Sequence, residues 1–263
     1  MYPLSFQEIQ ELSQNYNPLI NERALLDLLF RINSEAYSEL NQKTAREYIT
    51  SLLYSVYPNE ATIKSAFINS ILSKDKTSVS TFEFPVGNCR ADLCKINNNS
   101  YAYEIKTDFD NLKRIEKQIS NYRKVFEYTY VICSPRKVSD VEKTIDSDVG
   151  VIVYKMGSKK NYTFRIHRKS LKSDFIDPVE QLKALSTTEL DTLSSAYGLK
   201  VNAPLVMLIN HLGKECINKE FKKAIQHRYH DQWSFLIAHM HEICNIDYQY
   251  FYRTGVDPCC VYK

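Results

Sequence analysis

Three side chains near the middle of the sequence have types and a spacing that suit metal-dependent hydrolysis: Asp92, Glu104 and Lys106. Because side chains alternate between the two faces of a strand, Glu104 and Lys106 should emerge on the same face. Turn-forming residues at 97–99 predict an antiparallel strand pair that brings Asp92 beside Glu104. Carboxylates and backbone carbonyls are ligands that Mg²⁺ and Mn²⁺ prefer. We therefore predict that Asp92, Glu104 and the Ile105 carbonyl bind one of these ions.

These residues suggest one kind of reaction. A metal ion held by the two carboxylates could polarise a phosphodiester oxygen and lower the pKa of a bound water. Lys106 would position or deprotonate the attacking water and offset the negative charge that develops. The predicted reaction is the hydrolysis of a phosphodiester bond.

Glu60 is a further candidate ligand in the acidic cluster. Asn59 follows Pro58 and can cap a helix, which places Glu60 in the first turn of that helix. The helix dipole alone also favours an acidic residue there. Glu47 and Glu83 compete with Glu60 for the same role.

The elements that must position these residues form an α/β core. Alternating apolar residues predict strands over 79–86, 89–96, 101–107, 128–133 and 149–154, with an edge strand over 164–166. An amphipathic helix follows the third strand, and Asp110 is expected to cap it. The predicted order of the core elements is α-β-β-β-α-β.

The composition predicts a folded protein with helical additions on both sides of this core. The chain has 263 residues, of which 44% are hydrophobic, and this amount of apolar surface excludes disorder. Composition shifts near Pro58 and Pro178 divide it into an N-terminal helical layer (1–57), the core (58–177) and a C-terminal helical region packed on the core (178–263). The last twenty residues are expected to be irregular.

Together, these features resemble the PD-(D/E)XK nuclease superfamily, whose core has the same element order. The segment Gln118-Ile119-Ser120-Asn121-Tyr122 is similar to the Q-x-x-x-Y motif of the branch that contains recombination exonucleases. Gln118 and Tyr122 are one helical turn apart and share a face. The resemblance implies a restriction-endonuclease-like fold and a pair, Gln118 and Tyr122, that orients the scissile strand beside the metal. Ala91 stands where the superfamily often has proline.

Three further segments are similar to a family of bacterial and phage-encoded nuclease-like proteins without an assigned role. These segments are residues 90–93, 103–108 and 246–251. The similarity extends from about Glu60 to the C-terminus. It implies the same nuclease-type site.

Basic residues surround the predicted site and could bind nucleic acid through its phosphates. The net charge of +3 neither requires nor excludes such a partner. A solvated outer helix face is the alternative explanation for most of these cations. The candidates are Arg90, Lys113, Arg114, Lys117, Arg123 and Lys124.

Other features exclude several classes of protein. The six glycines lack the spacing of a Walker loop, a G-x-G-x-x-G turn or a G-x-S-x-G elbow. The histidines and cysteines of the C-terminal third lack the spacing of a zinc site. Seven cysteines without an apolar leader predict free thiols and a cytoplasmic protein. No apolar run reaches the roughly 20 residues of a membrane helix.

The sequence therefore predicts a Mg²⁺- or Mn²⁺-dependent nuclease that acts on DNA rather than RNA. Two alternatives stay open. One is a non-catalytic nucleic-acid-binding protein of the same fold, and the other is a ribonuclease toxin that acts on structured RNA.

Overall fold

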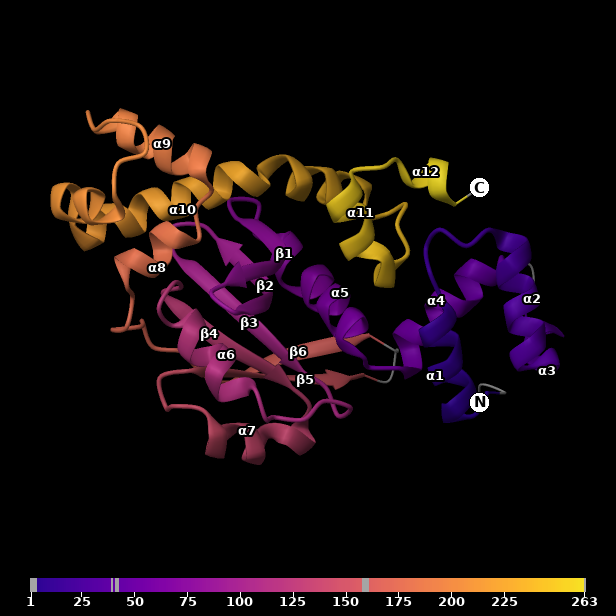
Figure 1. Ribbon diagram of the computed structural model, residues 1–263. Helices are drawn as coiled ribbons and strands as arrows, with labels where there is room; N and C mark the ends of the chain where they lie inside the picture. Colours follow the sequence, from indigo (N-terminus) through magenta and orange to yellow (C-terminus); the bar gives the residue numbers. More distant parts are fainter. Residues whose placement is uncertain (1–3, 39, 41–42, 158–160, 263) are drawn as a thin grey trace.

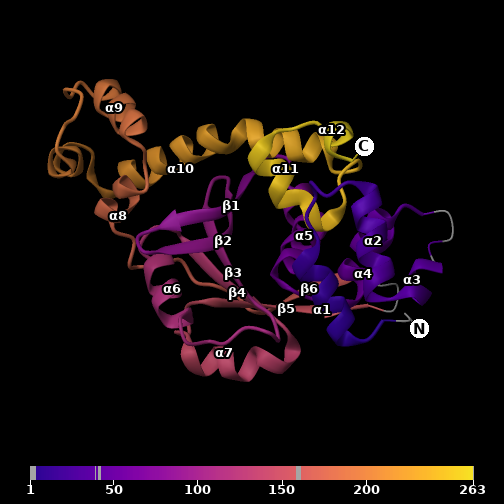
Figure 2. The ribbon, with the colours of Figure 1, turned by 45° about the vertical axis from the view of Figure 1, so that its right-hand side comes forward.

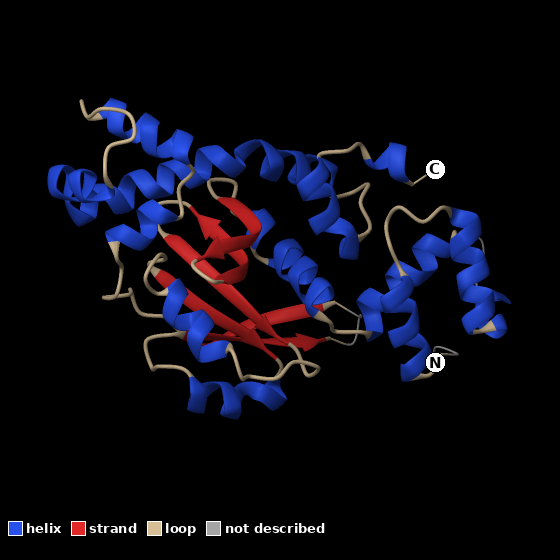
Figure 3. Ribbon diagram, viewed as in Figure 1, coloured by secondary structure: helices blue, strands red, loops and turns tan. Residues whose placement is uncertain are grey.

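The computed structural model describes residues 4–38, 40, 43–157 and 161–262, and its centre is a six-stranded mixed sheet with helices on both faces (Figures 1 and 3). The strand order is β1-β2-β3-β4-β5-β6. The first three strands form an antiparallel meander, β3, β4 and β5 are parallel to one another, and β6 is antiparallel to β5. The strands are β1 (Val79–Val86), β2 (Cys89–Ile96), β3 (Ser100–Lys106), β4 (Tyr128–Cys133), β5 (Gly150–Met156) and β6 (Tyr162–Arg168).

The core helices lie on the two sides of this sheet (Figure 2). Helix α5 (Glu60–Ser70) precedes β1, α6 (Ile115–Tyr122) connects β3 to β4, and α7 (Val138–Thr144) connects β4 to β5. The order α5-β1-β2-β3-α6-β4 agrees with the α-β-β-β-α-β order predicted from the sequence. The three-residue 3₁₀ turns η1 (Leu72–Lys74) and η2 (Pro135–Lys137) complete the core.

Helix α6 begins later than its sequence pattern predicts. Asp110 does not cap it, because its Oδ2 accepts hydrogen bonds of 2.8 Å from the Thr107 amide and 2.7 Å from the Thr107 hydroxyl. The residue at the N-cap position is Arg114, which makes no side-chain capping bond. Asp110 therefore stabilises the turn that leaves β3.

Two hydrophobic clusters fill the space on either side of the sheet. Ile63 and Phe67 of α5 pack with Leu93, Tyr103 and Ile105 in one cluster. The other contains three apolar residues of α6 and several small residues of the strands: Ile115, Ile119, Tyr122, Ala91, Cys94 and Ala102. Each face of the sheet is thus covered by its own helix.

The alternation of β1 and β2 breaks where the two strands pass the acidic residues. Phe82 packs in the α5 cluster and Phe84 in the α6 cluster, although they are two residues apart. Between them Glu83 has φ +53°, a conformation that is uncommon for a residue other than glycine. Leu93 and Ala91 of β2 divide between the clusters in the same way. The regular alternation of β1 and β2 is therefore interrupted at Glu83, beside the polar residues of the cavity.

The N-terminal helices have a hydrophobic cluster of their own, at the opposite end of the molecule from α8 and α9 (Figure 1). Capping boxes at Ser5 and Thr44 fix the starts of two of them. The four helices are α1 (Phe6–Asn15), α2 (Glu22–Ile32), α3 (Ser34–Ser38) and α4 (Ala45–Val56).

The C-terminal region packs on the core mainly through the long helix α10, which lies along the β1 edge of the sheet (Figure 1). Gly213 interrupts the helical geometry of α10 with φ +74°. The last residues are not irregular as predicted, because they form two short helices. The elements are α8 (Pro178–Lys183), α9 (Thr187–Ala196), α10 (Leu205–His239), η3 (Asn245–Asp247), α11 (Tyr248–Thr254) and α12 (Pro258–Val261). Among the described residues, no helix has the length and apolar composition needed to cross a membrane.

Candidate active site

Strands β2 and β3 separate in the middle of the sheet, and the candidate site lies where they part. Their hydrogen-bonded ladder ends at the pair Leu93 and Tyr103. Beyond this pair β2 stays beside β1, and β3 stays beside β4. Asp92 and Glu104 are the first residues past the end of the ladder, and both line one cavity. The antiparallel pairing predicted from the sequence thus brings these two carboxylates to one place.

Asp92 bridges the gap between the separated strands. Its Oδ2 accepts a hydrogen bond of 2.6 Å from the Ile105 amide, and its Oδ1 lies 3.8 Å from Lys64 Nζ. The Ile105 side chain is buried in the α5 cluster. The group of Ile105 that contacts Asp92 is therefore the N–H, while a ligand role for its carbonyl stays a prediction.

Glu104 is held by three side chains. Lys106 Nζ and Gln118 Nε2 each donate to Glu104 Oε1 at 2.6 Å. Lys106 Nζ also donates to Gln118 Oε1 at 3.2 Å. The Tyr122 hydroxyl lies 2.8 Å from Glu104 Oε2. The predictions that Glu104 and Lys106 share a face, and that Gln118 and Tyr122 lie beside a carboxylate, are confirmed by these contacts.

Tyr122 contacts the site from a buried position. It is fully buried, and its hydroxyl also lies 2.6 Å from the carbonyl oxygen of Arg90. Because Tyr122 has no exposed surface, its predicted part in orienting the scissile strand stays a prediction and would act through the groups that it contacts. Tyr122 positions Glu104 and joins α6 to β2.

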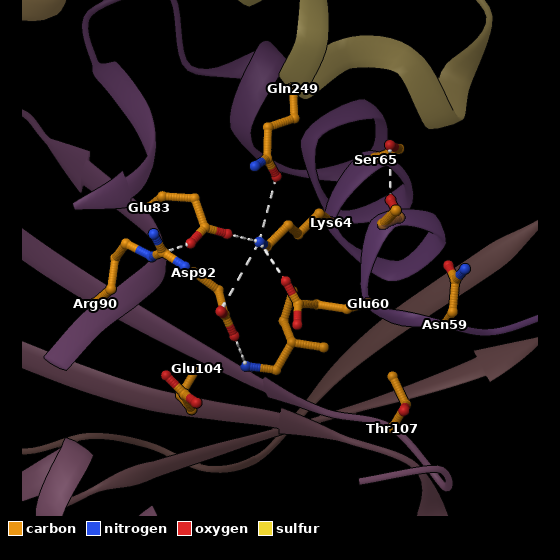
Figure 4. A network of polar contacts seen from close by, with 12 residues as sticks. Asn59, Glu60, Lys64, Ser65, Glu83, Arg90, Asp92, Glu104, Thr107 and Gln249 are labelled. Carbon is orange, nitrogen blue, oxygen red and sulfur yellow. Dashed lines mark hydrogen bonds and ion pairs between the residues drawn. The ribbon is translucent and has the colours of Figure 1, made fainter. Parts of the chain in front are cut away.

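A buried lysine of α5 occupies the centre of the remaining carboxylates (Figure 4). Lys64 is 2% exposed, and its Nζ lies 2.5 Å from Glu60 Oε1. It also pairs with Glu83, and it lies 3.4 Å from Gln249 Oε1 of α11. Glu60 is thus in the cluster, as predicted from its place in the first turn of α5.

Burial and mutual repulsion govern the charges of the site. Burial raises the pKa of Asp92 well above its usual range, and the neighbouring Glu104 raises it further. Burial also raises the pKa of Glu104, although its ion pair with Lys106 opposes this effect. Burial alone would lower the pKa of Lys64, but the charges of Asp92, Glu60 and Glu83 raise it. The site therefore holds more negative charge than it stabilises on its own.

The cavity has a volume of about 840 Å³ and is lined by both carboxylates and cations. Arg90, Arg114 and Lys117 are among the residues that line it. The Arg90 side chain is 64% exposed, and its Nε lies 2.5 Å from Glu83 Oε2. Such a site can hold a divalent cation through oxygen donors and bind the phosphates of a polyanion at its entrance.

Three of the six predicted phosphate-binding residues lie outside this cavity. Arg123 is buried, pairs with Asp146 and Asp148, and stacks over the Phe175 ring, so its predicted contact with nucleic acid is wrong. Its guanidinium already has partners and is not accessible. Lys113 and Lys124 are exposed but do not line the cavity.

Lys64 and Gln249 are not among the site residues predicted from the sequence, and Glu83 is predicted only as a competitor of Glu60. Lys64 follows Glu60 by four residues, which is the spacing of a helical ion pair. That spacing could have indicated an ion pair between Glu60 and Lys64. No local pattern could indicate Gln249, because it reaches the site from α11, 185 residues further along the chain.

Comparisons with known proteins match most of the chain. The family described as bacteriophage P4 protein cII matches residues 54–251. The chain is similar to protein cII of Enterobacteria phage P4, with 30% identity over 191 residues that make up 69% of this chain and 72% of the phage protein. It is also similar to a solved structure of a Silicibacter pomeroyi protein of unknown function, at 11% identity and a TM-score of 0.35. That match covers 51% of this chain and 88% of the other.

Proposed function

The chain belongs to the bacteriophage P4 protein cII family, and we propose, from the residues that line the cavity, that this cavity is the active site of a metal-dependent nuclease. The segment that matches the family contains all of these residues. We propose Mg²⁺ or Mn²⁺ as its cofactor, DNA rather than RNA as its substrate, and a restriction-endonuclease-like core as its fold. The observation that carries the proposal is the convergence of Asp92, Glu104 and Lys106 where β2 and β3 separate.

The donor set supports a divalent ion. Asp92 Oδ1 is 3.8 Å from Lys64 Nζ, too far for a hydrogen bond, so this oxygen is available as a ligand. Burial raises the pKa of both Asp92 and Glu104, and the charge of Glu104 raises that of Asp92 further, so a cation between them would stabilise the ionised carboxylates. When bound, the ion would supply a Lewis acid for a phosphate oxygen and for the attacking water.

Lys106 is the residue suited to act on the water. Its ammonium is fixed by Glu104 at 2.6 Å and by Gln118 at 3.2 Å. A cation held in place next to the reacting phosphate would position the water and offset the developing negative charge without reorganisation. Gln118 supports this geometry because its amide contacts both Lys106 and Glu104.

The cations of the cavity are suited to bind the substrate. Arg90, Arg114 and Lys117 line the space around the carboxylates. Phosphate contacts of this kind provide salt-dependent affinity without reading the sequence of the nucleic acid.

One observation favours the non-catalytic alternative. Each carboxylate of the site already faces a lysine, since Lys64 lies among Glu60, Glu83 and Asp92 and Lys106 pairs with Glu104. These two lysines offset part of the negative charge of the four carboxylates without a metal ion, as expected for a protein that only binds nucleic acid.

Incubation with labelled single-stranded DNA, double-stranded DNA and tRNA, in Mg²⁺, Mn²⁺ or EDTA, tests the proposal. DNA cleavage that requires the metal supports it, and cleavage of tRNA alone supports a ribonuclease. Retention of nucleic acid without cleavage supports the non-catalytic binder. Glu116→Gln is a matched control, because Glu116 is an exposed acid of α6 that does not line the cavity.

A further inference from the structure

Lys64 is a buried cation that lies against three acidic residues of the cavity. An ammonium has three N–H donors. Three acceptors lie within 3.5 Å of Lys64 Nζ: Glu60 Oε1, Glu83 Oε1 and Gln249 Oε1. Asp92 Oδ1 is the fourth neighbour at 3.8 Å. Every donor of this lysine is therefore directed at the cluster.

The same three carboxylates have the spacing of a metal site. One oxygen each from Glu60, Glu83 and Asp92 lies within 4.8 Å of the other two. They come from three elements, α5, β1 and β2, so the fold and not one local segment brings them together. Glu83 reaches this position from a backbone with φ +53°. Without a cation between them, three carboxylates at this distance repel one another strongly.

We infer that the ammonium of Lys64 is a resident cation and occupies the position that a second divalent ion would otherwise take among Glu60, Glu83 and Asp92. The site therefore binds one metal ion, at Asp92 and Glu104. The inference rests on the proposed function only for the position of that one ion. Lys64 is a positioning residue, because its ammonium holds Glu60 and Glu83 together beside Asp92, whose Oδ1 it faces at 3.8 Å without a hydrogen bond.

The other cations nearby cannot fill this role. Lys106 is engaged with Glu104 and Gln118. Arg90 contacts Glu83 from an exposed position at the outer side of the cluster. Lys64 alone is buried against all three carboxylates among the described residues.

Replacement of Lys64 by methionine keeps the aliphatic stem and removes the charge. The position among the three carboxylates is then open to a metal ion, so the number of metal ions bound per chain is the decisive measurement. Calorimetric titration with Mn²⁺ should give one ion per chain for the wild type and two for Lys64→Met. In the absence of metal, the thermal midpoint of Lys64→Met should fall by about 10 °C, because a buried group of carboxylates loses its counter-charge. Saturating Mn²⁺ should restore most of this loss.

A second buried ion pair provides the matched control. Lys222 Nζ lies 3.0 Å from Glu127 Oε2, and the Glu127 carboxylate is buried like those of the site. Lys222→Met should also lower the midpoint, but Mn²⁺ should not restore it, because Glu127 keeps Lys172 at 3.2 Å and one carboxylate is a poor ligand set. Rescue of both variants by Mn²⁺ would show a general effect of the ion and overturn the inference.

A double variant keeps the test decisive if Lys64→Met does not fold. Adding Glu83→Gln removes one of the repelling charges, so Lys64→Met/Glu83→Gln should have a higher midpoint than Lys64→Met. A lower midpoint would show that the ion pair of Glu83 with Arg90 outweighs its repulsion by the other carboxylates, and would contradict the need for a counter-charge at Lys64. Two Mn²⁺ ions in the wild type, or an unchanged stoichiometry in Lys64→Met and in the double variant, would also contradict it.

The outcomes separate this inference from the proposed function. If the wild type binds no Mn²⁺ and Lys64→Met binds one ion, Lys64 is the resident cation and the metal position at Asp92 and Glu104 is wrong. If the wild type binds one ion and Lys64→Met binds two, but DNA is never cleaved, the inference holds and the nuclease proposal fails. If neither protein binds Mn²⁺, Lys64 does not replace a metal ion.

Discussion

Asp92 Oδ2 accepts a hydrogen bond of 2.6 Å from the Ile105 amide, across the point where β2 and β3 stop pairing. The carboxylate thus takes the place that a backbone acceptor of β2 has in a continuous ladder. This contact fixes Asp92 relative to Glu104, which precedes Ile105 on β3. A substitution at Asp92 must therefore remove the charge and keep the acceptor if its effect on catalysis is to be interpreted.

Asp92→Asn meets this condition, because the amide oxygen of asparagine can still accept the Ile105 N–H. We expect cleavage to fall by at least about a hundredfold, the scale of a lost metal ligand or electrostatic group. The thermal midpoint should stay the same or rise, because a buried charge beside Glu104 is removed. Activity within threefold of the wild type, measured beside Glu116→Gln, would place the metal elsewhere.

Gln118→Ala tests the contribution of α6 to the site. The Gln118 amide donates a charge-assisted hydrogen bond of 2.6 Å to Glu104 Oε1. Loss of this bond should lower kcat about tenfold or more. The side chain is only partly buried, and the thermal midpoint should change little. Ser120→Ala on the exposed side of α6 is the control. A large drop in the midpoint with unchanged specific activity would make Gln118 a structural residue.

Tyr122→Phe should act mainly on stability. The hydroxyl contacts both Glu104 Oε2 and the Arg90 carbonyl in a fully buried position, and its removal leaves them without this donor. We expect a loss of about 1–3 kcal/mol in the free energy of unfolding, measured in urea. Tyr154→Phe is a matched control, because the buried Tyr154 hydroxyl has no hydrogen-bond partner among the described residues. Equal effects of the two changes would contradict a specific role for Tyr122.

Much of the fold could be predicted from local sequence patterns. The bounds of β1, β2 and β4 agree with the predicted strands, because alternating apolar residues end at clear turn residues on both sides. Asn59 caps α5 through its side chain as predicted. The cap of α6 was predicted wrongly. The Asp110 carboxylate can accept hydrogen bonds either from the first turn of a helix or from the turn before it, and here it accepts one from the Thr107 amide.

The candidate site could be predicted only where its residues lie on neighbouring strands. Asp92 and Glu104 follow from the hairpin register, and Lys106 follows from alternation. Lys64 could not be recognised as buried, since a helical lysine is solvated in most proteins. Gln249 depends on the packing of α11 against α5, a contact between distant parts of the chain.

Lys106→Met separates two explanations of a loss in rate. The ion pair with Lys106 lowers the pKa of Glu104, so its removal should raise that pKa further. If Lys106 acts only as this counter-charge, the lost rate should return as the pH rises and Glu104 ionises. If it positions the water, the rate should stay about a hundredfold lower at every pH while Mn²⁺ still binds. We expect the second result, read from pH–rate profiles beside Mn²⁺ titrations at high pH.

A buried carboxylate away from the cavity, Asp247, should make the free energy of unfolding depend on pH. Asp247 of η3 accepts hydrogen bonds of 2.7 Å from the hydroxyls of Tyr16 and Tyr262. It thus joins the N-terminal helices to the C-terminal end of the chain. Burial raises the pKa of Asp247 to about 6, although both tyrosines and Arg46 oppose this effect. The folded protein therefore binds a proton at Asp247 more tightly than the unfolded chain does.

Asp247→Asn should remove this dependence. A folded-state pKa above the unfolded value of 3.8 gives stability that is present below about pH 4 and is lost as the pH rises through about 6. The shift corresponds to about 3 kcal/mol. Asparagine keeps the acceptor for both tyrosines without the charge, so the stability of Asp247→Asn relative to the wild type should increase by about this amount between pH 4 and pH 7. Urea unfolding at both pH values measures it, with the exposed Asp140→Asn as control. A difference between variant and wild type that is the same at both pH values would mean that Asp247 does not titrate in this range, because only a change in proton binding on unfolding gives a slope with pH.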